Sequence, residues 1–316
     1  MQRAVGMASF AAITMLVVPA AAGIAAAAGT PAPAPKRAVV EITRTFVDRS
    51  RPTPPNEAAH EAGAPSRTLP TTIWIPAGKG PFPLIVFAHG NGSDPQRYAA
   101  TVAPWAAAGY VVAAPTFPIS SRDGGSVGGV ADVANQPRDV EFVLGRMLAL
   151  ARHRGVLHHK VDAKHVGVAG HSLGAITTLG VAERSCCRDA RVGAAISISG
   201  TPLVSGTDFA GHAPPLMLVH GDHDPTVNYA GSTSSYARAT PPKYLVTVVG
   251  GHHDDFLGGG PNTAAVAEVN TATTDFWDAY LKGDRAALRR LPNDAGPGVT
   301  TMQSDPGSTN GKAASS

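Results

Sequence analysis

The 316-residue chain has few of the residue patterns that are typical of disulfide-rich, fibrous or nucleic-acid-binding proteins. Its only two cysteines, Cys186 and Cys187, are adjacent and cannot join distant segments, so a disulfide scaffold is excluded. They form either a strained vicinal ring or two thiols packed in one turn. Lys and Arg form no long run and the formal net charge is only +3, which argues against a nucleic-acid partner. Glycine and proline are frequent but aperiodic, which excludes collagen and favours a globular chain with many turns.

Long apolar runs are missing after the first 29 residues. Within these first 29 residues, Arg3 precedes the largely apolar stretch Met7–Ile24 and the small residues Ala25–Gly29. This order predicts a signal peptide over residues 1–28 and a secreted, extracellular protein. The alternative is an N-terminal membrane anchor, but the run is Ala-rich and interrupted by Ser, Thr, Pro and Gly, which makes a poor permanent span. Residues 29–37 are rich in Pro and Ala and are expected to be a linker.

Buried strands alternate with amphipathic helices from residue 84 onward. Strands are predicted at Val39–Val47, Thr71–Ile75, Leu84–Ala88, Tyr110–Ala114, Val166–Ala169, Val192–Ser199, Leu216–Val219 and Tyr244–Val249. Helices are predicted at Tyr98–Ala108, Ala131–Arg154, Leu173–Glu183, Asn228–Ala239 and Ala264–Lys282. The pattern predicts an α/β fold with a mostly parallel twisted sheet and helices on both faces. We expect one catalytic domain over residues 38–290 and a disordered tail over 291–316.

A serine follows the strand at 166–169, at the carboxyl end of the sheet where such folds place their active sites. The segment Gly170-His171-Ser172-Leu173-Gly174 fits the G-x-S-x-G pattern, in which small residues permit a sharp strand-to-helix turn around a nucleophile. The structural alternative is a helix-capping serine. A second match at residues 124–128, around Ser126, lies in a Gly-rich loop with no strand before it, and we reject it.

A serine nucleophile needs a base, and the base needs an orienting acid. The strand at 216–219 is followed by two candidate acids, Asp222 and Asp224, and the strand at 244–249 by two candidate bases, His252 and His253. Spacing alone decides neither choice. The oxyanion also needs two backbone N–H donors. We expect one from Leu173 and the other from Asn91, with Gly92 as the alternative and an ordinary glycine turn as the structural explanation.

The same two loops could instead bind zinc or calcium, because they are dense in nitrogen and oxygen donors. The donors are His220, Asp222, His223, Asp224, His252, His253, Asp254 and Asp255. This hypothesis leaves Ser172 and its turn unexplained. No H-E-x-x-H helix accompanies the two loops.

Four segments together resemble the α/β-hydrolase superfamily: LIVFAHGNG (84–92), GHSLG (170–174), HGDHDPTV (220–227) and GGHHDDF (250–256). The chain is most similar to the bacterial group related to dienelactone hydrolases, chlorophyllases and platelet-activating-factor acetylhydrolases, with support from NQPRDVEFVLGRML (135–148). The resemblance covers residues 70–285 and implies Asp224 as acid and His253 as base. Ala175, where secreted polyester hydrolases carry another Gly, weakens a polyester substrate. A serine in place of cysteine means that a dienelactone substrate is not implied.

The sequence therefore predicts a secreted serine esterase that forms an acyl-enzyme on Ser172. Only Gly200–Pro215 separates two consecutive core strands, too little for a large cap domain, so we expect an open cleft edged by Phe117–Val130 and Thr201–Phe209. An open apolar cleft suits esters of short or medium acyl chain. The alternatives are an extracellular acyltransferase on the same triad and a non-catalytic secreted binding protein. We expect no cofactor, an ester substrate as partner, no stable membrane span, and a monomer.

Overall fold

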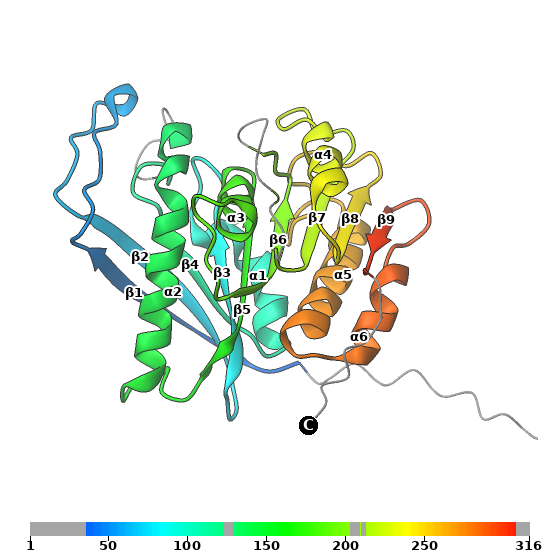
Figure 1. Ribbon diagram of the computed structural model, residues 1–316, viewed down its shortest axis with the longest axis horizontal. Coiled ribbons are helices and arrows are strands. Elements are labelled where there is room, and N and C mark those ends of the chain that lie inside the picture. The colour runs from blue at the N-terminus through cyan, green and yellow to red at the C-terminus, as the bar shows by residue number, and fades with distance from the viewer. Residues whose placement is uncertain (1–35, 123–128, 203–208, 210–212, 308–316) are drawn as a thin grey trace, which may run out of the picture. The chain divides into compact units, whose positions relative to one another are not determined.

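The computed structural model describes residues 36–122, 129–202, 209 and 213–307, and within them nine strands form one sheet (Figure 1). The strands are β1 (Val39–Asp48), β2 (Arg67–Pro76), β3 (Phe82–Ala88), β4 (Val111–Pro115), β5 (Val161–His171), β6 (Val192–Ile198), β7 (Leu216–Gly221), β8 (Lys243–Val248) and β9 (Thr300–Asp305). Their order in the sheet is β1-β2-β4-β3-β5-β6-β7-β8-β9. The six strands from β3 to β8 pair in parallel, and β1, β2 and β9 pair antiparallel at the two ends. The predicted mostly parallel α/β sheet is confirmed.

Helices cover both faces of the sheet. On one face lie α2 (Gln136–Arg152), α3 (Leu173–Glu183) and α4 (Ala230–Arg238), and on the other lie α1 (Ala99–Ala107) and α5 (Thr263–Leu281) (Figure 1). A hydrophobic core lies on each face of the sheet, and strand β3 contributes side chains to both, because alternate side chains point to opposite faces. Its Leu84 and Val86 pack in the core under α2, and its Ile85 and Phe87 pack in the core under α1 and α5. Burial on both faces explains why the central strands are continuously apolar.

Two predicted helices begin later than the apolar spacing suggested, because a 3₁₀ turn precedes each of them. The predicted helix from residue 98 starts as η2 (Pro95–Tyr98) before α1, and the one from residue 131 starts as η3 (Gly129–Ala134) before α2. The remaining elements are two 3₁₀ turns, η1 (Glu57–Ala59) and η4 (Leu291–Asn293), and the short helix α6 (Arg285–Arg290).

The prediction of a disordered tail from residue 291 is wrong for residues 291–307. The turn η4 packs the buried Leu291 against the core under α5, and β9 then pairs antiparallel with β8 from Val248↔Thr300 to Lys243↔Asp305. The sequence Thr-Thr-Met-Gln-Ser-Asp of β9 is polar because the strand lies at the edge of the sheet, where half of its residues are solvent-exposed. Composition alone therefore made it look like a tail. The predicted signal peptide, most of the predicted linker and residues 308–316 lie outside the described residues.

A buried ion-pair network holds η3 and α2 against the N-terminal strands. The guanidinium of Arg67 at the start of β2 is fully buried and donates to the carboxylates of Asp132 in η3, at 2.9 and 3.1 Å, and of Asp139 in α2. Arg51 donates to Asp139 from the other side at 2.6 Å. Because a buried charge must be paired, this network fixes η3 in position. The turn η3 in turn forms part of the site described below.

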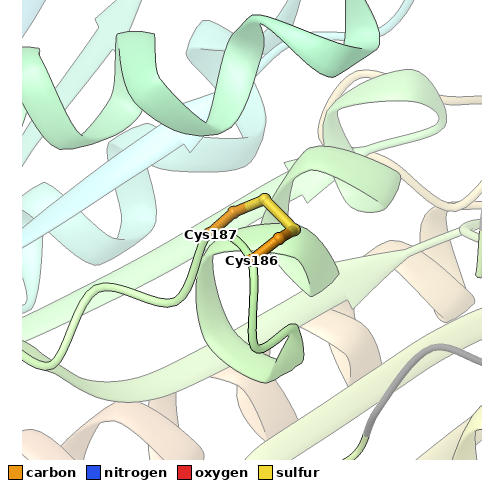
Figure 2. The surroundings of a disulfide bond; sticks show 2 residues. All are labelled: Cys186 and Cys187. Carbon is orange, nitrogen blue, oxygen red and sulfur yellow. A yellow bond between two sulfur atoms is a disulfide. The ribbon is translucent and has the colours of Figure 1, made fainter.

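The adjacent cysteines close a vicinal disulfide in the turn after α3, which resolves the two possibilities left by the sequence (Figure 2). Glu183, the last residue of α3, lies three residues before this turn. Its side chain is buried, and neither carboxylate oxygen has a hydrogen-bond partner among the described residues. Burial raises the pKa of Glu183 from 4.5 to about 7, with a smaller opposing effect from Arg188.

Glu183 should make the folded chain less stable at neutral pH than at acidic pH. Because its folded pKa is raised, the folded state binds this proton more tightly than the unfolded state, so stability falls as pH rises from 4.5 to about 7. The loss should be on the order of 3 kcal/mol, at about 1.4 kcal/mol per pH unit. The variant Glu183→Gln should lose less stability between pH 5 and pH 8 in urea unfolding. Glu141→Gln, an exposed position on α2, should behave like the parent. Parallel pH curves for the parent and Glu183→Gln would contradict the assignment.

Candidate active site

The strand-to-helix turn at Ser172 has the strained backbone expected of a nucleophile. Strand β5 ends at His171 and α3 begins at Leu173, with Ser172 between them at φ 56° and ψ −119°. A non-glycine residue at positive φ is costly and persists only when its surroundings enforce it. The Ser172 N–H donates to the carbonyl of Ile198 in β6 at 2.9 Å, and its carbonyl accepts from Ala175 and Ile176 in α3. These contacts enforce the turn.

The two glycines of the pentapeptide are required by close contact with neighbouring backbone. A Cβ on Gly174 would lie 2.0 Å from the carbonyl oxygen of Ala88 at the end of β3. A Cβ on Gly170 would lie 2.3 Å from the carbonyl oxygen of Gly174. Both distances are far inside van der Waals contact. The predicted reason for small residues at these positions is thus confirmed by the packing of the turn.

An imidazole–carboxylate pair joins the loops after β7 and β8. His253 Nδ1 lies 2.7 Å from Asp224 Oδ2, and the Asp224 side chain is fully buried while 16% of the His253 side chain is exposed. Asp224 Oδ1 accepts the N–H groups of Thr226 and Val227 at 2.7 and 2.9 Å. Burial by itself would raise the pKa of Asp224, but the hydrogen bonds from His253 and the two backbone amides hold that pKa below its ordinary value. The ionised carboxylate therefore accepts the Nδ1 proton and leaves Nε2 of His253 as the basic atom.

The alternative acid and base lie elsewhere. Asp222 is exposed and its Oδ1 accepts the N–H of Gly250 at 2.6 Å, so it braces the loop after β8. His252 has 64% of its side chain exposed and lies 3.5 Å from Asp255. Neither forms the close pair that Asp224 and His253 form. Of the four candidates, the structure thus brings together the two that the family resemblance selects.

Ser172 lies beside this pair at the same edge of the sheet. The ring of the preceding residue, His171, has its centroid 4.7 Å from that of His253. A Cβ on Gly90, in the loop after β3, would lie 3.3 Å from Ser172 Cβ. The Ser172 hydroxyl makes no hydrogen bond with any described residue. Catalytic hydrogen bonds are commonly long in free enzymes and tighten when substrate binds.

The candidate oxyanion donors come from two loops. Leu173 is the first residue of α3, so its N–H has no intrahelical acceptor. In the loop after β3, Gly90 N–H donates to the Tyr98 hydroxyl at 3.1 Å and Gly92 N–H donates to the Ser120 carbonyl at 2.8 Å. Gly92, the alternative donor, thus donates to a backbone carbonyl in this structure, and Asn91 stays a prediction from the sequence. Asn91 also reaches η3, where a Cβ on Gly129 would lie 2.2 Å from its Oδ1.

A second imidazole, which sequence reasoning assigned only to a metal hypothesis, holds the acid. His220, at the end of β7, is buried, and its Nε2 lies 3.0 Å from both Asp224 Oδ2 and the Val227 carbonyl. Burial lowers the pKa of His220 despite the nearby Asp224, so the neutral ring carries its proton on Nε2 and accepts from Ser232 at Nδ1, 2.7 Å away. The signal in the sequence was a histidine at the end of a buried strand, four residues before the acid.

A third buried histidine shapes the loop that carries Asn91. Burial lowers the pKa of His89 to about 4, so its ring is neutral. Its Nε2 accepts the N–H of Phe117 at 3.0 Å, and its Nδ1 therefore donates to the Gly90 carbonyl at 2.8 Å. The sequence showed His89 only as the residue after a strand. Its contacts fix the start of the loop relative to the segment after β4.

The metal hypothesis gains no support from the geometry. Among residues 36–122, 129–202, 209 and 213–307, no group of three or more His, Cys, Asp or Glu side chains is arranged to hold a metal ion. Instead, His220 and His253 each hydrogen-bond to Asp224. In the same described ranges, no helix is long and apolar enough to cross a membrane.

Comparison with known proteins agrees with this fold. The family model described as Chlorophyllase matches residues 42–227, more than half of the chain and a range that includes Ser172 and Asp224. Among solved structures, the ferulic acid esterase from Streptomyces cinnamoneus matches with a TM-score of 0.64 and 22% sequence identity, over 81% of this chain and 93% of that one. At that identity the likeness shows the fold. No curated protein sequence matches the chain.

Proposed function

The chain belongs to the chlorophyllase family of α/β-hydrolases, and on that basis we propose that it is a secreted carboxylic ester hydrolase with the triad Ser172, Asp224 and His253. The observation that carries the proposal is the 2.7 Å contact between His253 Nδ1 and a buried, ionised Asp224, beside a serine on a strained turn. A structural capping serine does not account for this pair. It needs neither a positive φ nor an oriented imidazole beside it.

The proposed reaction is acyl transfer to water in two steps. His253 Nε2 takes the Ser172 hydroxyl proton as the oxygen attacks the ester carbonyl carbon, and Asp224 stabilises the imidazolium that forms. The N–H groups of Asn91 and Leu173 donate to the oxyanion, aided by the positive end of the α3 dipole. His253 then gives its proton to the departing alcohol oxygen. A water molecule, deprotonated by His253, attacks the acyl-enzyme and releases the acid and the free Ser172 hydroxyl.

The substrate class follows from the shape of the chain around the site. Only Ser199–Pro215 separates β6 from β7, a segment too short for a large cap domain, and a site without such a cap suits esters of small acyl groups. Because one structural relative is a ferulic acid esterase, we include esters of ferulic acid and similar phenolic acids among the proposed substrates. Residues 1–28 supply the proposed export signal, which is removed on secretion.

A fluorophosphonate probe tests the proposal directly. We expect stoichiometric labelling that peptide mass spectrometry maps to Ser172, and hydrolysis of nitrophenyl esters that is fastest for short or medium acyl chains. Methyl ferulate should be cleaved in the same panel. Addition of an alcohol acceptor should not divert the acyl group from water, which separates hydrolysis from acyl transfer. Labelling at another residue, or none, would overturn the proposed function.

A further inference from the structure

An unbroken path of hydrogen bonds joins the three loops that carry the proposed machinery. The Gly90 N–H, beside Asn91, donates to the Tyr98 hydroxyl at 3.1 Å. Tyr98 Oη lies 2.9 Å from His171 Nδ1, and His171 Nε2 lies 3.0 Å from the carbonyl oxygen of His253. Ser199 Oγ donates to the same carbonyl at 2.8 Å. The residue beside the nucleophile is thus tied to the oxyanion loop on one side and to the base on the other.

The direction of every bond in this path is fixed by chemistry. A carbonyl oxygen only accepts, so Nε2 of His171 must carry the proton that faces His253. Burial lowers the pKa of His171 to about 3, so the ring is neutral and Nδ1 is an acceptor. The Tyr98 hydroxyl must then donate to Nδ1, which leaves its oxygen to accept from Gly90. Only one arrangement satisfies all four groups.

The path is buried and rigid. His171 is 3% exposed and Tyr98 1% exposed. The Tyr98 ring packs against Phe87 of β3 with centroids 4.9 Å apart, and against His171 at 5.6 Å. Side chains held in this way do not face solvent and are not placed to touch a substrate. Their effect must pass through the groups that they hold.

The loop after β8, which carries the base His253, needs contacts that hold its main chain in place. Gly250 and Gly251 precede the two histidines and are held by Asp222 and by backbone hydrogen bonds, but these contacts end before His253. The His253 side chain is held by Asp224, but its main chain is held at the carbonyl by His171 and Ser199. The G-x-S-x-G pattern accepts any residue at the position of His171, so the turn itself does not require a histidine.

We propose that His171 is a positioning residue. Together with Tyr98 and Ser199, it holds the base His253 and the Gly90–Asn91 loop at the positions that catalysis by Ser172 requires. This inference rests on the proposed triad. A displacement of about 1 Å in a catalytic group can lower the rate by about 10²-fold, so these contacts should act on kcat. They should have little effect on KM, because none of the three side chains is placed to touch substrate.

The test compares His171→Leu with His171→Gln in the full chain. Leucine removes both hydrogen bonds, and kcat for nitrophenyl acetate should fall about 10- to 100-fold with KM within about twofold. Glutamine retains an acceptor and a donor and should recover a large part of that loss. The acid limb of the kcat/KM pH profile should move in the leucine variant and stay in place in the glutamine variant. His165→Leu, an exposed histidine on the same strand, should match the parent.

A second variant keeps the test valid if His171→Leu fails to fold. Tyr98→Phe removes one hydroxyl, and with it the hydrogen bonds to Gly90 and His171, but keeps the ring packing. It should lower kcat about three- to tenfold with the folded fraction unchanged, a loss on the scale of hydrogen-bond energies. Rates are divided by the sites that fluorophosphonate labels, so misfolded molecules do not count. If the leucine variant and Tyr98→Phe both keep parental kcat per labelled site and a parental pH profile, the inference is wrong. A parent that neither labels nor turns over would instead refute the proposed function.

Discussion

Replacement of Ser172 by alanine should abolish ester hydrolysis, with kcat lower by about 10³- to 10⁶-fold. Without the hydroxyl no acyl-enzyme can form, and only the oxyanion donors and substrate binding remain to accelerate attack by water. The measurement is the initial rate of nitrophenyl ester hydrolysis together with fluorophosphonate labelling, and both should be lost in the variant. Folding should be unaffected, because the Ser172 hydroxyl makes no hydrogen bond with any described residue.

The matched control is Ser126→Ala. Ser126 is the central residue of the chain's second G-x-S-x-G match, at residues 124–128, which lies outside the described residues. Its replacement should leave kcat and labelling within about twofold of the parent, within the ±0.5 kcal/mol usual for a neutral substitution. If Ser126→Ala loses activity while Ser172→Ala keeps it, the nucleophile has been assigned to the wrong pentapeptide.

The variant Asp224→Asn should lower kcat by about 10⁴-fold while the chain remains folded. An amide in place of the carboxylate can present its NH₂ group to Nδ1 of His253, and the ring would then carry its proton on Nε2, where it cannot accept one from Ser172. The imidazolium would also lose its counter-charge. Two further donors, the Thr226 and Val227 amides, face the same side chain and favour the amide orientation with oxygen toward them.

Asp222→Asn is the control for this substitution. Asp222 lies two residues away in the same loop, but its carboxylate braces Gly250 instead of His253. An asparagine oxygen can still accept that N–H, so kcat should change by less than about fivefold, within the range of the loss of one hydrogen bond. Equal losses in the two variants would show that the loop, and not the carboxylate on His253, controls the rate.

Sequence patterns predict the structure of this chain correctly where local chemistry and burial agree. The strands at 84–88 and 192–199 are apolar because both faces of the sheet are covered, and their type and place were predicted correctly. Strand β9 was missed because an exposed edge strand has no apolar pattern to reveal it. The 3₁₀ turns before α1 and α2 share the apolar spacing of the helices they precede, so the helix boundaries were placed too early.

The candidate site shows the same division. The pentapeptide around Ser172 could be recognised because a strained turn requires glycine at fixed positions, which is a local demand. The choice between Asp222 and Asp224, and between His252 and His253, could not be made from spacing. Both members of each pair follow the same strand, and only the path of the loops decides which one faces inward. The family resemblance supplied that choice.

By itself, the sequence determined the mostly parallel sheet, the strained serine turn and the edge of the sheet where the chemistry-bearing residues gather. Each of these is encoded in neighbouring residues, through alternation, burial and glycine spacing. Only the tertiary structure decided that His220 shares the carboxylate of Asp224, and that His171 and Tyr98 connect the base loop to the oxyanion loop. These contacts join residues 4 to 82 positions apart along the chain. Their geometry follows from how loops pack at the ends of strands, which no local pattern records.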